Sequence, residues 1–193
     1  MKFKAFKALV ENERNPKIKC LRSDNGGEFT SNEFNEFCEN HGIKRQFSAA
    51  KTPHQNGVAE RKNKTVQKVA RTMLNEAKLL DGYWREAIYT IVFVQNRGHL
   101  RVNSDKTPYE LWFGISTSVK YFRAFGSKCY IKRDDDNLGK FESRTNEGIF
   151  LGYSSTKKEY ICYNIRLNKI IERENVIVDD TKPRRIQIQQ LIL

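Results

Sequence analysis

Two carboxylates in polar, glycine-containing segments are the residues of this chain best suited to do chemistry. Asp24 lies in the segment SDNGGEF and Glu60 in the segment PHQNGVAER, and thirty-five residues separate the two acids. Carboxylates bind hard divalent cations such as Mg²⁺ or Mn²⁺, which leave coordination positions for water or phosphate. Two such cations can activate an attacking oxygen and stabilise a leaving one in phosphodiester chemistry. Taken singly, each acid also has a structural explanation, Asp24 as a turn residue and Glu60 as an acid in the first turn of a helix.

The elements around the two acids are predicted to place one just after a strand and the other on a helix. Residues 18–23 are typical of a short strand, and Asp24 follows it directly. Residues 48–57 are expected to form a polar loop, and a long helix is predicted from about 58 to 80. Glu60 then lies in the first turn of that helix, so the two acids can converge on one cation.

The predicted long helix has two different faces. One face is apolar and falls within a sector about 100° wide. Its members are Val58, Val66, Val69, Met73 and Ala77. The far side carries Glu60 together with Lys64, Gln67, Lys68 and Arg71. A solvated face is the ordinary explanation of such a charged stripe, but its position beside Glu60 favours contact with nucleic acid.

The rest of the pattern is an α/β unit followed by a run of short strands. Further helices are predicted over 3–15, 31–40, 83–96 and 108–113, with a second strand over 43–47. Strands are predicted over 127–133, 147–153, 158–164, 169–173 and 175–180. Five strands at this spacing are typical of a small barrel or meander.

The composition points to a folded chain with a polyanionic partner. The 193 residues include twelve Phe, eight Tyr and two Trp, enough apolar material for a sizeable core. The formal net charge of +12 and the pI near 9.6 favour binding to polyanions, because Lys and Arg release counterions from nucleic acid. A basic pI also occurs in proteins that bind no nucleic acid.

The cysteines and the apolar runs exclude several other classes. The four cysteines form no CxxC pair, which argues against a zinc ribbon or a disulfide framework. Cys38 and His41 make a C-x-x-H pair that is more typical of one turn of an ordinary helix than of a metal site. The longest apolar run, residues 87–94, is too short to span a bilayer, and the N-terminus lacks a secretory segment. We therefore expect an intracellular protein without a membrane partner.

The segments around the two acids resemble a known family. SDNGGEF followed by TPHQNGVAERKN closely resembles the integrase region of copia-type (Ty1/copia) LTR-retrotransposon Pol polyproteins. The resemblance continues through TPYELWFG, FGSKCYIKR, EGIFLGY and NVIVDD, in the family's order, to about residue 180. It implies an RNase H-like integrase core followed by an SH3-like barrel. The implied domains are 1–114 for a partial core with following helices, 115–125 for a linker, 126–180 for the barrel and 181–193 for a tail.

The resemblance assigns roles to individual residues. It implies that Asp24 and Glu60 are the second and third catalytic acids and ligands of Mg²⁺ or Mn²⁺. The predicted DNA-contacting residues are Asn25, Gln55, Asn56, Arg61, Lys64, Lys68 and Arg71, of which Lys68 and Arg71 follow from helical spacing alone. DNA, as element ends and target duplex, is the implied partner; self-association is a further expectation, and no small-molecule substrate is expected. The implied location is the nucleus or a cytoplasmic virus-like particle.

One part of the family's site has no counterpart in this sequence. The family's first catalytic Asp lies well upstream of the second, and no aspartate occurs among the 23 residues before Asp24. That first Asp is expected to bridge both metals, so we expect two-metal chemistry to fail in this chain alone. The same gap leaves residues 18–23 and 43–47 as the expected remnant of a five-stranded sheet, with marginal stability.

Three functional interpretations follow. The chain is a piece of an integrase whose complete form transfers DNA strands with Mg²⁺. As a polypeptide by itself, it is expected to bind nucleic acid without catalysing transfer. The alternative, from another class, is a protein-interaction module built on the SH3-like barrel.

Overall fold

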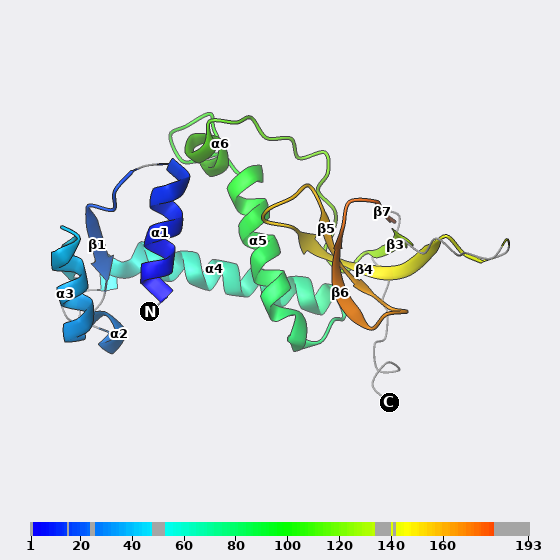
Figure 1. Ribbon diagram of the computed structural model, residues 1–193, viewed down its shortest axis with the longest axis horizontal. Coiled ribbons are helices and arrows are strands. Elements are labelled where there is room, and N and C mark those ends of the chain that lie inside the picture. The colour runs from blue at the N-terminus through cyan, green and yellow to red at the C-terminus, as the bar shows by residue number, and fades with distance from the viewer. Residues whose placement is uncertain are drawn as a thin grey trace. The chain divides into compact units, whose positions relative to one another are not determined.

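The computed structural model describes residues 2–14, 16–23, 26–47, 53–133, 140 and 142–179. Only the backbone is described for residues 14, 28, 53–56 and 58. The chain divides into two compact units, 1–64 and 65–193, and each is described here by itself. Figure 1 shows the elements of both units.

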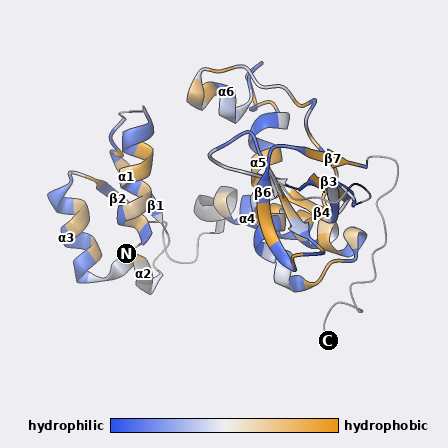
Figure 2. Ribbon diagram, turned by 45° about the vertical axis from the view of Figure 1, so that its right-hand side comes forward, coloured by the Kyte–Doolittle hydropathy of each residue, from blue (hydrophilic) through white to orange (hydrophobic). Residues whose placement is uncertain are grey.

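The first unit is a small α/β arrangement. Its elements are α1 (Lys2–Arg14), β1 (Cys20–Ser23), α2 (Gly27–Thr30), α3 (Asn32–Asn40), β2 (Lys44–Phe47) and the start of α4 (Pro53–Ala77). Strands β1 and β2 pair in parallel, from Cys20 opposite Lys44 to Ser23 opposite Phe47. Helix α1 carries both hydrophobic and hydrophilic residues (Figure 2), so only part of its surface can pack on a core.

The core of the first unit forms around α3. Ser31 caps this helix, since its side chain accepts a hydrogen bond from the Phe34 backbone N–H. Phe34 and Cys38 then fall on one face and are almost fully buried together with Ile43. Phe3 of α1 packs edge-on against Phe34, with ring centroids 5.3 Å apart. The parallel β1–β2 pair is thereby covered by side chains from α1 and α3.

The second unit is a five-stranded antiparallel sheet with helices packed on it. Its elements are the end of α4, the 3₁₀ turn η1 (Asp81–Tyr83), α5 (Trp84–Gly98), α6 (Pro108–Phe113), β3 (Lys128–Lys132), β4 (Thr145–Tyr153), β5 (Tyr160–Asn164), β6 (Lys169–Arg173) and β7 (Val176–Val178). The strand order is β6-β5-β4-β3-β7, and every pairing is antiparallel. One core cluster joins the end of α4 and α5 to β4 through residues such as Leu74, Ile91 and Leu151.

Two glycines allow the helices to approach the sheet closely. A Cβ on Gly152 would lie 2.2 Å from Thr90 Oγ1, and one on Gly126 would lie 2.3 Å from the Ala77 Cβ. The β4–β5 register shifts between Phe150, opposite Cys162, and Gly152, opposite Ile161, which leaves Leu151 as an extra residue in β4. The Thr90 hydroxyl donates a 2.8 Å hydrogen bond to the Leu151 carbonyl oxygen in a buried position. The bulge thus joins α5 to β4 by a hydrogen bond.

Helix α6 is defined by strong local signals. Thr107 and Glu110 form a capping box, in which the Thr107 side chain accepts from the Glu110 N–H and the Glu110 carboxylate accepts from the Thr107 N–H. Pro108 occupies the first turn, and Gly114 ends the helix in a left-handed conformation with φ of 70°. The motif TPYELWFG therefore encodes a helix with both of its ends.

The long helix α4 differs from its predicted bounds at both ends. It begins at Pro53 rather than near 58, so the predicted 48–57 loop is helical from Pro53 onward. Proline suits the first turn because its missing N–H would have no helical partner there. The helix ends at Ala77 rather than near 80, since Lys78 adopts φ of 53° and the Leu79 N–H bonds back to the Leu74 carbonyl. This is a Schellman termination, closed by burial of Leu74 and Leu79.

The predicted fold class and most of the other predicted helices and strands agree with the structure. The predicted fold class, α/β followed by a small all-β domain, is confirmed. All five C-terminal strands occur, and α6 and β6 have the predicted bounds. The helix predicted over 31–40 is confirmed as α3, preceded by the separate turn α2. The domain boundaries at 114, 126 and 180 follow the family's motifs and stay a prediction; the predicted tail 181–193 lies outside the described residues.

Candidate nucleic-acid interface

Helix α4 separates a buried face from an exposed one. Ala70, Leu74 and Ala77 are buried in the core of the second unit, where Val66, Val69 and Met73 pack against them. Ala70 and Leu74 were absent from the predicted apolar face. The predicted sector missed them because alanine carries a weak apolar signal and because Leu74 lies about 60° beyond the sector's edge, so the buried face of α4 is wider than predicted. The buried set fixes which side of α4 faces solvent.

The exposed face of α4 carries the predicted basic residues. Glu60, Arg61, Lys64, Lys68 and Arg71 are all exposed. Glu60, Lys64, Lys68 and Arg71 follow one another at spacings of three and four residues, which places them on one side of a helix. None of these side chains forms an ion pair with another residue in the described part of the chain. Their charges are therefore available to an external polyanion.

Gly57 allows Arg61 to lie close to the helix backbone. A Cβ at Gly57 would lie 3.0 Å from Nη1 of Arg61, one turn further along α4. Gly57 itself is buried, whereas Arg61 is exposed. The glycine of the QNG motif thus provides space for the guanidinium group near the start of the helix.

Two predicted site residues lie outside the described part of the chain, and two more are described by their backbone alone. Asp24 and Asn25 lie outside the described residues. Gln55 and Asn56 belong to the first turn of α4, but only their backbone is described. Glu60 lies about two turns into α4, because the helix starts at Pro53 rather than at 58. The convergence of Asp24 and Glu60 on one cation stays a prediction.

The described residues do not assemble a cation site. No three His, Cys, Asp or Glu side chains gather within the described ranges. The C-x-x-H pair, Cys38 and His41, makes packing contacts. Cys38 is fully buried, and the centroid of the His41 ring lies 4.2 Å from that of the Phe37 ring. Of the two predicted metal ligands, only Glu60 is described, and one exposed carboxylate does not hold a divalent cation by itself.

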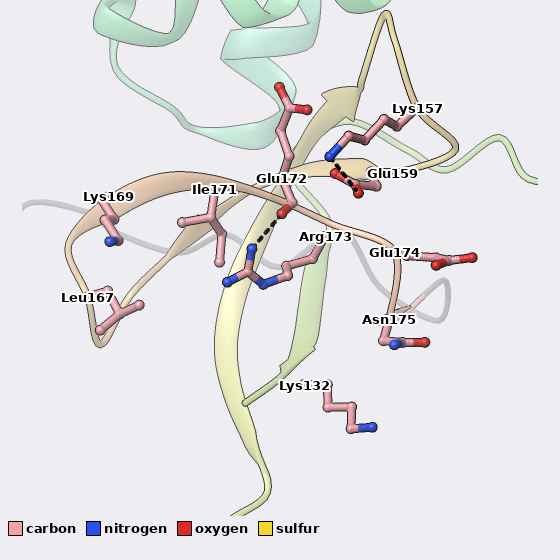
Figure 3. A pocket seen from close by; sticks show the side chains of 10 residues that line it. All are labelled: Lys132, Lys157, Glu159, Leu167, Lys169, Ile171, Glu172, Arg173, Glu174 and Asn175. Carbon is pink, nitrogen blue, oxygen red and sulfur yellow. Dashed lines mark hydrogen bonds and ion pairs between the residues drawn. The ribbon is translucent and has the colours of Figure 1, made fainter. Parts of the chain in front are cut away.

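An open hollow on the sheet of the second unit has mixed charge. Its volume is about 580 Å³. Figure 3 shows its lining side chains, which include Lys132, Lys157, Lys169, Arg173, Glu159, Glu172 and Glu174. Lys157 forms an ion pair with Glu159 at 3.6 Å, and Arg173 donates to the Glu172 carbonyl oxygen. Because acids and bases alternate there, this surface is a weaker polyanion candidate than α4.

A second concave region was not predicted from the sequence. Arg97 lies between the rings of Phe93 and Tyr109, with its guanidinium carbon 3.7 and 3.9 Å from their centroids. These residues line a cleft of about 710 Å³ in the second unit. The i, i+4 spacing of Phe93 and Arg97 was a readable signal, but Tyr109 joins them only through the packing of α6 on α5.

The family models that match this chain cover two different segments. Residues 127–190 match the model of the retroviral polymerase SH3-like domain, and residues 13–76 match that of the TnsB C-terminal domain. The first match contains strands β3 to β7. It confirms the predicted SH3-like domain in the C-terminal part of the chain.

The curated relatives are retrotransposon polyproteins. The chain is 35% identical over 182 residues to the retrovirus-related Pol polyprotein from transposon TNT 1-94 of Nicotiana tabacum. It is 32% identical over 178 residues to those from transposons RE1 and RE2 of Arabidopsis thaliana. The chain belongs to the copia-type retrotransposon Pol family. The matches cover 92 to 94% of this chain but only 12 to 14% of the relatives, so this copia-type chain corresponds to a small part of a Pol polyprotein.

Two solved structures share limited similarity with this copia-type chain. One is the HTLV-2 integrase catalytic core domain in complex with magnesium, with 25% identity and a TM-score of 0.42; the match covers 56% of this chain and 65% of that one. The other is a simian T-cell lymphotropic virus intasome in complex with a PP2A regulatory subunit, with 14% identity and a TM-score of 0.44. That match covers 95% of this chain and 64% of the other.

No helix in the described ranges is long and apolar enough to cross a membrane. The 25 residues of α4 are the longest helix that the structure describes, and its exposed face is polar and basic. The apolar run at 87–94 belongs to α5, whose Ala87, Thr90 and Ile91 are buried against the second unit's own core.

Proposed function

We propose that this chain is the part of a copia-type integrase region that binds DNA through the exposed face of α4. The observation that supports this most directly is an exposed basic set on α4, in which no member forms an ion pair with a described residue: Arg61, Lys64, Lys68 and Arg71. Four cations along one helix match the repeating phosphates of a nucleic-acid backbone, and each released counterion adds to affinity at low salt. The net charge of +12 strengthens long-range attraction to the same partner.

We further propose that Asp24 and Glu60 are the metal-binding acids of the complete integrase. When bound, Mg²⁺ would supply charge stabilisation at a phosphodiester, as the paired carboxylates suggest. In the complete enzyme the expected activity is DNA strand transfer. For the polypeptide of residues 1–193 alone, we propose weak or absent Mg²⁺ binding and no strand transfer, because two carboxylates give each of two cations too few protein ligands.

A duplex-binding measurement tests the role of α4. Fluorescence anisotropy with a labelled 20-base-pair duplex should show affinity that falls steeply with salt. Reversing two charges in Lys64→Glu with Lys68→Glu should flatten the slope of log K against log salt by about 1.8, since each lost phosphate contact removes about 0.9. The control is Lys106→Glu with Lys120→Glu, which makes the same change in net charge at exposed positions outside α4. An equal loss in both double variants would show that only total charge matters, and the proposal for α4 would be wrong.

A strand-transfer assay tests the catalytic part independently. The polypeptide of residues 1–193 is incubated with Mg²⁺ or Mn²⁺, donor ends and a target duplex, and no joined product is expected. Joined product that disappears in Glu60→Gln would overturn the inactive assignment and would identify Glu60 as a catalytic residue. Self-association stays a prediction, which sedimentation velocity at several protein concentrations can test.

A further inference from the structure

An aromatic cleft in the second unit combines aromatic rings with hydrogen-bond donors that have no partner among the described residues. It has a volume of about 710 Å³ and lies among α5, α6, the segment 115–118 and the β4–β5 hairpin. This volume lies within the range of roughly 300–1,000 Å³ typical of small-ligand sites. The cleft belongs wholly to the second unit and lies outside the residues assigned to the basic face of α4.

Arg97 is the central charged group of the cleft. Its guanidinium group is stacked between the rings of Phe93 and Tyr109, at 3.7 and 3.9 Å from their centroids. It donates no hydrogen bond to, and forms no ion pair with, any other described residue. Stacking occupies the two faces of a guanidinium group but leaves the N–H groups at its edge able to donate. These N–H groups are spaced to donate hydrogen bonds to the oxygens of a phosphate or a carboxylate.

Two tyrosine hydroxyls add to the unpaired donors. No hydrogen bond to a described residue is found for the hydroxyls of Tyr109 and Tyr121, although both residues line the cleft. The other two tyrosines of the lining differ: Tyr153 Oη accepts from the Arg123 N–H at 2.8 Å, and Tyr160 Oη donates to the Tyr121 carbonyl at 3.1 Å. Burial raises the pKa of Tyr121, and nearby Arg97 partly offsets this, so the phenol stays a neutral donor at pH 7.

The remaining lining favours a nucleotide over an acidic peptide. Lys157 and Lys158 lie on the hairpin side, while Glu159 pairs with Lys157 at 3.6 Å and Glu174 is the other acid of the lining. With Arg97, the cations exceed the acids by only one, which is too little to attract a run of carboxylates. The rings of Phe93 and Tyr109 are already stacked by Arg97 and by neighbouring rings. Tyr121 and Tyr160 of the wall make only edge-on or tilted ring contacts, so a planar base can pack on them, for about 1–3 kcal/mol.

We propose that this cleft binds a nucleotide of single-stranded nucleic acid, with its phosphate on Arg97 and the hydroxyls of Tyr109 and Tyr121. The base packs on the rings of Tyr121 and Tyr160, and Lys158 lies near the neighbouring phosphate. This site is separate from duplex binding by α4 and does not depend on it.

Calorimetric titration of the full chain with 5′-phosphorylated tetrathymidylate tests the proposal. The wild-type chain should bind the probe, and removal of the 5′-phosphate should weaken binding several-fold. Arg97→Met keeps a long apolar side chain between the rings but removes the donors, and should weaken binding by tenfold or more. The matched control is Arg85→Met, which removes an arginine stacked on Tyr89 of the same helix, outside the cleft. Tyr121→Phe should give a smaller loss, and thermal unfolding of each variant checks that the fold is kept.

Two further arms separate the alternatives. Lys64→Glu with Lys68→Glu should retain tetrathymidylate binding, so a failure of the α4 proposal leaves this result intact. Arg97-dependent binding of an acidic octapeptide with affinity equal to that of the oligonucleotide would overturn the nucleotide assignment. Unchanged oligonucleotide binding by Arg97→Met, or no binding by the wild-type chain at low salt, would also overturn it.

Discussion

Replacing Gly126 with alanine should destabilise the second unit more than the same change at Gly114. Gly126 follows Phe125 in the motif FGSKCYIKR and has φ of 82°, in the region that favours glycine. Its backbone lies against the end of α4, where an added Cβ would be 2.3 Å from the Ala77 Cβ and 3.3 Å from the Ala77 Cα. The Ala77 Cβ is attached directly to the helix backbone and has no rotamer to change, so this clash cannot be relieved by rotating a side chain.

The expected loss has two parts. Holding a non-glycine residue in a left-handed conformation costs about 1–2 kcal/mol. Overpacking a close contact costs about 1–3 kcal/mol more. Together they predict a loss of about 2–5 kcal/mol, which corresponds to a Tm lower by roughly 4 to 20 °C in a chain of this size.

Thermal unfolding followed by circular dichroism measures this effect. Gly114→Ala is the matched control, since Gly114 has φ of 70° but no atom within 4 Å of an added Cβ. Gly114→Ala should lose only the free energy of holding alanine in a left-handed conformation, about 1–2 kcal/mol. A double-mutant cycle with Ala77→Gly isolates the contact. The change in unfolding free energy caused by Ala77→Gly should be about 1–3 kcal/mol more favourable in the Gly126→Ala background than in the wild-type chain. Equal losses in Gly126→Ala and Gly114→Ala, or no coupling to Ala77, would refute the close-approach reasoning.

Two further changes test how the second unit is held together. Thr90→Val keeps the side-chain shape but leaves the buried Leu151 carbonyl without its hydroxyl donor, and should cost about 1–3 kcal/mol in urea unfolding, whereas Thr72→Val on the exposed face of α4 should cost almost nothing. Hydrogen bonds from the Thr107 and Thr117 N–H groups lower the pKa of Glu110 to about 2 from 4.5. Its stabilising effect is therefore present above pH 4.5 and is lost as the pH falls toward 2, so Glu110→Gln should reduce stability at neutral pH and flatten that acid transition. A Glu110→Gln curve parallel to the wild type between pH 5 and 2 would contradict this assignment.

The family motifs outside the two acids have structural explanations. Gly126 and Gly152, from FGSKCYIKR and EGIFLGY, permit the close approach of α4 and α5 to the sheet. TPYELWFG supplies a capping box and a left-handed end for α6. The resemblance therefore extends beyond the candidate site to the contacts that hold the second unit together.

The elements with local signals were predictable from the sequence. Helix α6 has its cap, its proline and its terminal glycine within eight residues, and its bounds were predicted correctly. Strand β6 lies between clear turn residues and was also predicted correctly. Helix α4 has a long amphipathic pattern, so the exposure of Lys64, Lys68 and Arg71 followed from spacing alone. Its first turn was missed because QNG looked like a loop, although Pro53 is compatible with a helix start.

The sequence by itself determined the family, the order of the main elements and the basic face of α4. The family is carried by short motifs, and the elements and the basic face follow from residue patterns within a few positions along the chain. Tertiary structure decided the burial of Ala70 and Leu74, the close contact of Gly126 with Ala77, and the stacking of Arg97 between Phe93 and Tyr109. The pairs Gly126 with Ala77 and Arg97 with Tyr109 each join different elements, and no periodic pattern in the sequence connects their positions. Only the packing of helices on the sheet brings such groups together, and packing depends on shape across the whole unit.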